Sequence, residues 1–255
     1  MDSPVSAGTI KFVKSLGQKK FRDLRGVFVV EGEKMVEEAL ASSFEVTMRF
    51  TAGEVGRNTM ERLSLLSSPS PALAVVRKPE GISIDDVSTA DLPAKGLFLA
   101  LDGIRDPGNL GTILRIADWF GVDGVFASPD TVDIFNPKVV QATMGAIFRV
   151  RFHYCGIKAL CRRFSAIGGK VYGTFLDGNV MYSESLEDGS RAPAVIVVGN
   201  ESNGISPEVA EEVDGRLFIP PYPEGRKGSE SLNAAVATAI TVAEFRRRSA
   251  LENKP

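Results

Sequence analysis

The sequence has little of the chemistry that metal sites and disulfide scaffolds require. It contains two cysteines, Cys155 and Cys161, and one histidine, His153, in 255 residues. The cysteines are six residues apart, which is not the spacing of a metal site, and two thiols do not make a disulfide framework. A single histidine in the predicted strand RVRFHY argues against a multi-histidine metal site and against a histidine-based catalytic triad. We therefore expect no metal ion, and a cytoplasmic protein whose thiols stay reduced.

Long apolar runs and targeting signals are missing as well. Apolar runs such as residues 97–101 and 195–198 have the length of strands and are too short to cross a bilayer. The first residues, MDSPVSAGTIKF, lack the basic and apolar regions of a secretory signal. No Walker loop occurs, and no G-x-G-x-x-G follows the first predicted strand of either domain. The sequence thus predicts no membrane partner and no nucleotide-binding loop of these two kinds.

The composition is that of an ordinary globular protein, with 44% hydrophobic and 24% charged residues and a net charge of −2. RNA-binding proteins are often basic, so any positive surface must be local. The best candidate is a group of residues near the N-terminus, Lys14, Lys19, Lys20, Arg22 and Arg25. Taken alone this segment is a solvated helix face and loop. Beside the motifs described below, we interpret it as a surface that binds RNA.

Alternating strands and helices predict two α/β domains, residues 1–78 and 96–255, joined by a polar linker at 79–95. In the first domain we expect helices at 6–16, 33–42 and 58–65, and strands at 26–32, 46–51 and 72–79. In the second we expect strands at 97–101, 124–127, 150–153, 170–175, 194–198 and 217–219, and helices at 109–120, 137–146, 157–168, 207–213 and 231–248. This alternation predicts a mainly parallel sheet that is covered on both faces.

Three segments of the second domain combine glycine with polar side chains near a predicted strand end. They are DGIRDPGNLGTILRIADWFGVD (102–123), VIVVGNESNGIS (195–206) and SLNAAVATAI (231–240). In α/β sheets, ligands bind beyond the carboxyl ends of the strands, and glycine lets a ligand approach the backbone closely. The sequence therefore predicts one ligand site built from these three segments.

In this order and spacing the three segments resemble the motifs of the SpoU (TrmH-type) family of RNA ribose 2′-O-methyltransferases, within the SPOUT superfamily. The resemblance covers about the last two-thirds of the chain. Less specifically, FVVEGEKMVEEAL (28–40) resembles an L30e-like RNA substrate-binding domain. The resemblance implies a C-terminal domain with a deep trefoil knot, S-adenosylmethionine as methyl donor, and a homodimer that completes the active site. It implies 2′-O-methylation of structured RNA, and the N-terminal domain favours ribosomal over transfer RNA.

The resemblance also assigns roles to individual residues. Those assigned to catalysis are Asn109, Arg115, Glu201, Ser231 and Asn233, and those assigned to donor binding, through main-chain groups, are Val198, Gly199, Ile219, Ser231 and Leu232. Because a guanidinium does not deprotonate in proteins, we expect Arg115 to clamp an RNA phosphate that relays the proton, and to stabilise the developing alkoxide. Glu201 is expected to pair with Arg115 or with an arginine across the dimer.

Several alternatives stay open from the sequence. Asn109 lies at an expected helix N-cap, where it would also orient Arg115 or the ribose, and Ser231 is interpreted equally well as a cap or as a catalytic residue. The loop at 220–230 is longer than usual for the family, so Arg226 and Lys227 either contact RNA or belong to an exposed turn. Trp119 is expected in the core or at a dimer interface. A non-catalytic RNA-binding or ribosome-assembly factor and a base methyltransferase are the competing functions.

Overall fold

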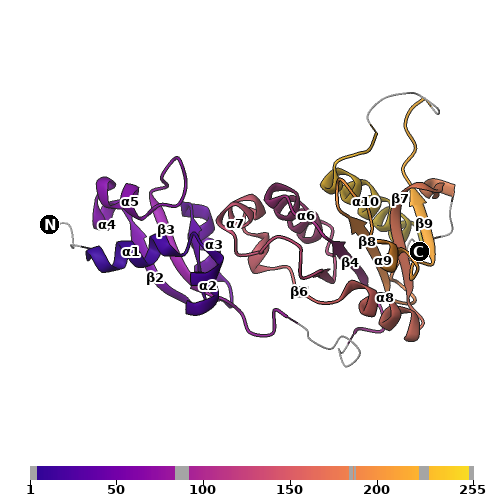
Figure 1. Cartoon of the computed structure of the whole chain (residues 1–255), viewed down its shortest axis with the longest axis horizontal. Helices are drawn as coiled ribbons and strands as arrows, with labels where there is room; N and C mark the ends of the chain where they lie inside the picture. The colour runs from indigo at the N-terminus through magenta and orange to yellow at the C-terminus, as the bar shows by residue number, and fades with distance from the viewer. Residues whose placement is uncertain (1–4, 84–91, 184–185, 187, 224–229, 253–255) are drawn as a thin grey trace. The chain divides into compact units, whose positions relative to one another are not determined.

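The structure is a computed structural model, and it describes residues 5–83, 92–183, 186, 188–223 and 230–252. Arg226 and Lys227, predicted to bind RNA, lie outside the described residues. The chain divides into two compact units, which are described separately (Figure 1). The first unit contains residues 1–80 and 133–149, and the second contains residues 81–132 and 150–255.

The first unit is built on an antiparallel sheet of the order β1-β3-β2. Its strands are β1 (Val27–Glu31), β2 (Val46–Thr51) and β3 (Ala72–Arg77), and its helices include α1 (Ala7–Ser15), α2 (Lys19–Arg25), α3 (Glu33–Ala41), α4 (Ala52–Val55), α5 (Arg57–Leu63) and α7 (Pro137–Thr143). All residues of β1 are buried, and apolar side chains of α1 and α5 pack against β1 and β3. The predicted strands and helices of this region are present.

Helix α2 is an element that the sequence did not predict. It spans seven residues, and its one buried side chain is an arginine, Arg22. A pattern search looks for apolar residues at helical spacing, so a helix whose inward position is charged gives no signal. The short α4 was also not predicted.

The second unit contains a six-stranded sheet in which every described strand pair is parallel, which confirms the predicted mainly parallel sheet. The strand order is β6-β5-β4-β8-β7-β9. The strands are β4 (Leu97–Asp102), β5 (Gly124–Ala127), β6 (Phe152–Tyr154), β7 (Lys170–Val180), β8 (Ala194–Gly199) and β9 (Gly215–Phe218). The helices are α6 (Pro107–Trp119), α8 (Ile157–Ala166), α9 (Pro207–Ala210) and α10 (Ala234–Glu252). The predicted trefoil knot stays a prediction.

The centre of this sheet fixes where a ligand can bind. From β4 the chain proceeds outward to β5 and β6 on one side, whereas β8 lies on its other side. The strand order therefore reverses between β4 and β8, and ligands of open α/β sheets bind beyond the carboxyl ends of the strands at such a point. Both central strands are apolar and almost entirely buried, as expected for a parallel sheet that is covered on both faces.

Several predicted boundaries are wrong by a few residues. The helix expected at 137–146 ends at Thr143, because Met144 and Gly145 have positive φ angles of 50° and 94°. The helix expected at 207–213 ends at Ala210, and the one expected at 231–248 begins at Ala234. Strand β7 continues to Val180 through a shift in register between Thr174 and Asn179. These corrections move element ends without changing the order of the elements.

The last helix is anchored by charged side chains near its C-terminal end. Arg246 donates from Nε to the carbonyl oxygen of Phe120 at 2.8 Å, next to the end of α6. The Glu244 carboxylate, 8% exposed, accepts hydrogen bonds of 2.7–2.8 Å from Arg247 and Arg248. These bonds, that of Arg247 first, lower the pKa of Glu244 from its ordinary value to about 2. The charged carboxylate therefore stabilises the folded state.

We expect Glu244→Gln to lower the free energy of unfolding at neutral pH by about 2 kcal/mol, the usual size of a hydrogen bond to a charged group. A depressed folded-state pKa contributes stability above the unfolded value, and this contribution is lost as the pH falls through the folded value. The difference between wild type and variant should therefore shrink as the pH falls from about 4.5 towards about 2. Urea unfolding at several pH values tests this. A constant difference would contradict it, and Glu45→Gln, in an exposed pair with Arg77, is the control.

Candidate active site

The loops that follow β4 and β8 are tied together at the switch point. Asp102, the last residue of β4, is in register with Gly199 of β8. The Asp102 carboxylate accepts a hydrogen bond from the N–H of Ser206 at 2.7 Å. Asn200 donates from Nδ2 to the carbonyl oxygen of Gly103 at 2.8 Å. The first and second predicted motifs thus form one structure at this edge of the sheet.

Gly199 is required by this loop structure itself. A Cβ atom at residue 199 would collide with the backbone of Gly204 and Ile205, and Asn200 and Gly204 exchange backbone hydrogen bonds of 2.8 and 3.0 Å. The absence of a side chain at Gly199 therefore lets the second motif fold back on its own strand. Its predicted role in donor binding through main-chain groups stays a prediction.

Helix α6 begins two residues earlier than predicted. Asp106 is the N-cap, because its carboxylate accepts a hydrogen bond from the N–H of Asn109 at 2.8 Å, and Pro107 is in the first turn. The predicted N-cap role of Asn109 is therefore wrong. An aspartate followed by proline is a strong helix-start signal, so the Asp106-Pro107 pair indicates the helix start that the structure has. The Asn109 side chain is free for other contacts.

Three of the predicted catalytic residues form a hydrogen-bonded chain. Asn233 donates from Nδ2 to Oδ1 of Asn109 at 2.8 Å, and Asn109 donates from Nδ2 to Oε1 of Glu201. Oδ1 of Asn233 accepts from the N–H groups of Ala235 and Val236, so Asn233 also caps α10. Because those helix N–H groups can face only an oxygen, they fix which way the Asn233 amide points. The Asn109 amide is fixed in turn, and its NH₂ group faces Glu201.

Among the described residues, Arg115 and Ser231 form no hydrogen bond with this chain of amides. Arg115 is exposed on α6, and no described residue forms a hydrogen bond or an ion pair with it. Glu201 is bonded to Asn109 and forms no ion pair with Arg115 among the described residues; its predicted pairing with Arg115 or with an arginine across a dimer stays a prediction. Ser231 is exposed, and since Asn233 caps α10, the interpretation of Ser231 as the cap is wrong.

The predicted donor-binding residues lie at the ends of β8 and β9 and before α10. Val198 is buried near the end of β8, Ile219 follows β9, and Leu232 is 47% exposed. Within the described residues, no hydrogen bond engages the main-chain N–H groups of Ser231 and Leu232. Main-chain donors that have no partner in the described part of the chain, beside an exposed apolar side chain, fit a ligand that carries both a polar base edge and an apolar face. These residues are compatible with S-adenosylmethionine.

The predicted RNA-binding residues of the first unit differ in exposure. Lys19 is exposed and pairs with Asp23 at 2.6 Å, Lys20 lies over the ring of Phe21, and Arg25 is exposed. Lys14 donates to the carbonyl oxygen of Ser64. Arg22, in contrast, is 2% exposed and bonded within the unit, so its predicted contact with RNA is corrected to a structural role.

Other features bear on the competing chemistries. In the described part of the chain no three His, Cys, Asp or Glu side chains are grouped so that they could hold a metal ion, and no helix there is long and apolar enough to cross a membrane. Burial raises the pKa of both cysteine thiols to about 12, so neither is a reactive nucleophile.

Trp119 is 86% exposed, which excludes a core position and leaves the predicted dimer interface.

The second unit thus has an open parallel α/β sheet with a polar site at its switch point, beyond the carboxyl ends of the strands, where such folds bind ligands. The SpoU rRNA Methylase family model matches residues 96–243, and the model of an MRM3-like substrate binding domain matches residues 8–78. The chain belongs to the SpoU rRNA methylase family, which confirms the predicted family.

Relatives along the whole chain agree with this assignment. The 23S rRNA (guanosine(2553)-2′-O)-methyltransferase RlmP of Bacillus subtilis is 32% identical over 252 residues, covering 93% of this chain and 95% of the relative. A solved structure of a putative RNA methyltransferase of the TrmH family from Porphyromonas gingivalis is 39% identical, with a TM-score of 0.84, and covers 96% of this chain and 100% of that one. An AdoMet-bound rRNA methyltransferase from Sinorhizobium meliloti is 28% identical, with a TM-score of 0.83 and coverages of 96% and 97%.

Proposed function

We propose that this protein transfers a methyl group from S-adenosylmethionine to a ribose 2′-hydroxyl of ribosomal RNA. The observation that carries the proposal is the oriented chain from Asn233 through Asn109 to Glu201 at the switch point of the sheet. The activity named for the Bacillus subtilis relative and the AdoMet bound in the Sinorhizobium meliloti structure support the choice of reaction and donor. A polar site of this kind suits a hydroxyl acceptor, since it offers both hydrogen-bond donors and acceptors.

The main-chain groups of Val198, Gly199, Ile219, Ser231 and Leu232 would hold the donor, which supplies an electrophilic methyl group when bound. The task left to the protein is to place the ribose oxygen and to receive its proton, so that positioning contributes most of the rate. Oε1 of Glu201 is engaged by Asn109, whereas no described residue donates a hydrogen bond to Oε2. We assign that oxygen to accept a hydrogen bond from the ribose hydroxyl, and Ser231 stays a proposed catalytic residue.

Arg115 is the cation that this reaction needs. It is exposed and has no partner among the described residues, so within that part of the chain no ion pair has to be broken before it binds a phosphate. Its charge would stabilise the alkoxide that develops as the proton leaves, and the clamped phosphate would relay that proton. Lys14, Lys19, Lys20 and Arg25 of the first unit, and Arg226 and Lys227, are the further residues that we propose to contact the RNA backbone.

Transfer of labelled methyl from S-adenosylmethionine to unmodified total RNA tests the reaction. We expect label in the ribosomal fraction, at a site that becomes resistant to alkaline hydrolysis, because a methylated 2′-oxygen cannot attack the neighbouring phosphate. Label that leaves the site sensitive to alkali would indicate base methylation instead. RNA binding without methyl transfer and without donor binding would support the non-catalytic assembly factor.

We also propose that the enzyme acts as a homodimer in the cytoplasm. The support for a dimer is the side chain of Trp119 at the end of α6, an apolar group that is 86% exposed. Exposed tryptophan is typical of protein interfaces. Two buried free thiols are consistent with a reducing compartment.

Trp119→Glu should therefore convert the dimer to a monomer. A charge placed in a desolvated interface removes a hot-spot contact, and we expect the dimer dissociation constant to rise about 100-fold. Light scattering after size-exclusion chromatography measures the mass, and methyl transfer should fall with the dimer fraction. Leu24→Glu, which changes an exposed leucine of α2 (72% exposed), is the matched control. An unchanged dimer in the Trp119 variant would contradict this interface.

A further inference from the structure

A segment from the middle of the methylase region belongs structurally to the first unit. Residues 133–149 lie between β5 and β6 in sequence, yet they group with residues 1–80. Two aromatic pairs hold them there, Phe135 with Phe28 (ring centroids 4.7 Å apart) and Phe148 with Phe44 (5.2 Å apart). The unit that matches a substrate-binding domain is therefore discontinuous in sequence.

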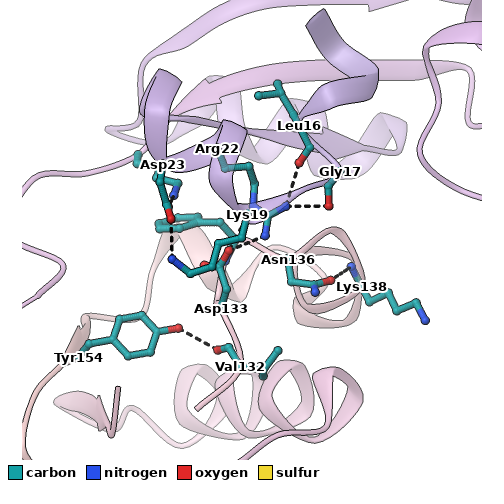
Figure 2. A network of polar contacts seen from close by, with 12 residues as sticks. Leu16, Gly17, Lys19, Arg22, Asp23, Val132, Asp133, Asn136, Lys138 and Tyr154 are labelled. Carbon is teal, nitrogen blue, oxygen red and sulfur yellow. Dashed lines mark hydrogen bonds and ion pairs between the residues drawn. The ribbon is translucent and has the colours of Figure 1, made fainter. Parts of the chain in front are cut away.

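A buried ion pair lies at the start of this segment (Figure 2). Arg22 donates from Nη2 and Nε to one carboxylate oxygen of Asp133, at 2.5 and 3.2 Å, and the two side chains are 2% and 10% exposed. Nη1 of Arg22 donates to the carbonyl oxygens of Leu16 and Gly17, at 2.9 and 3.0 Å. The other Asp133 oxygen accepts from the N–H of Phe135 at 3.1 Å. Both charges are therefore satisfied, and removing one would leave its partner buried and unpaired.

Val132, the residue before Asp133, forms two hydrogen bonds within the second unit. Val132 donates its N–H to the carbonyl oxygen of Ile104 at 2.9 Å, and its carbonyl oxygen accepts from the Tyr154 hydroxyl at 2.8 Å (Figure 2). Ile104 belongs to the loop between Asp102 and the Asp106 cap of α6. A single peptide bond thus joins Val132, which is bonded to the loop before α6, to Asp133, which is bonded to Arg22.

We infer that Arg22 and Asp133 are positioning residues for the RNA substrate. Because no residue separates Asp133 from Val132, the first unit is connected by this peptide bond, and not only by the linker, to a residue that is bonded to the loop preceding α6 and Asn109. This inference rests on the proposed function. A buried ion pair suits a connection between two units, since it requires one geometry while adding little net stability compared with apolar packing.

Asp133→Asn in the full chain tests the role in methyl transfer. We expect KM for RNA to rise at least tenfold, kcat at saturating RNA to stay within threefold, and the dissociation constant for S-adenosylmethionine to be unchanged, in samples that circular dichroism shows to be folded. Asp133→Glu keeps the charge and should restore most of the affinity for RNA. Arg77→Gln breaks an exposed ion pair of the same unit and should leave KM unchanged. A folded Asp133→Asn protein with the wild-type KM would overturn the inference.

A second measurement needs no enzymatic activity. A protease site inserted between the exposed residues Glu80 and Gly81 allows the purified full chain to be cut at the boundary of the two units. With Asp133 in place, the two fragments should co-elute in size-exclusion chromatography. In Asp133→Asn the dissociation constant of the two fragments should rise at least tenfold. An equal dissociation constant in wild type and Asp133→Asn would contradict the proposed role of the Arg22–Asp133 ion pair. If wild type methylates no RNA but its fragments stay together, the proposed function fails, whereas the structural role of the Arg22–Asp133 ion pair is supported.

Discussion

Arg115→Ala is expected to lower methyl transfer about 1000-fold, at the upper end of what one electrostatic donor to a transition state provides. The dissociation constant for S-adenosylmethionine should change less than twofold, because the assigned donor contacts are main-chain groups elsewhere. Arg115→Lys should restore little of the methyl-transfer rate, since an ammonium cannot form the bidentate hydrogen bonds that a guanidinium forms with a phosphate. Single-turnover transfer at saturating RNA, together with calorimetric donor titration, measures both quantities.

The matched control for Arg115 is Arg162→Ala. Arg162 is 63% exposed on α8 and pairs with Glu212 in the same unit, so its loss removes an exposed arginine without touching the proposed site. Its activity should stay within twofold of wild type. Full activity in Arg115→Ala would remove this residue from the mechanism, and equal loss in both variants would point to general loss of positive charge as the cause.

Asn109→Ala should have the second largest effect, a loss in kcat of about 100-fold, because misplacing a group that orients the acceptor costs about that much. The substitution removes the only described hydrogen bonds from Asn233 to Asn109 and from Asn109 to Glu201. Asn109→Asp should be no better. Its carboxylate cannot donate to Glu201, and two neighbouring carboxylates repel each other.

Rates measured across pH separate this role from a loss of folding. In Asn109→Asp one of the two facing carboxylates should take up a proton at a higher pH than an isolated acid, so part of the lost activity should return as the pH is lowered. Asn58→Asp on α5, an exposed asparagine of the first unit, should behave like wild type. Activity within threefold of wild type in Asn109→Ala would show that the amide chain is not needed.

The parallel sheet and the place of its site could be predicted because their signals are local. Runs such as LFLAL and AVIVV have the length and composition of buried strands, and the three motifs follow strand ends whose location the fold dictates. The convergence of Asn109, Glu201 and Asn233 followed from the resemblance and is present in the structure. Their mutual bonding was not predicted, because the helix start was placed at Asn109 and not at Asp106.

The features that escaped prediction depend on contacts between distant parts of the chain. Arg22 and Asp133 are 111 residues apart, and nothing in either neighbourhood indicates that a basic residue is buried. The membership of residues 133–149 in the first unit has the same origin, since their apolar pattern fits a helix against either unit. Sequence patterns report which face of an element is buried, but not which partner covers it.

The double role of Asn233 has a consequence for the enzyme during its own synthesis. Its oxygen is held by the start of α10 while its NH₂ group orients Asn109, so the site cannot take its final form before α10 has left the ribosome and docked. A nascent chain that has emerged only as far as β8 contains Asn109 but lacks the Asn233 amide that orients it. An enzyme made in the vicinity of ribosomal RNA would thus remain inactive until α10 has been synthesised and has docked.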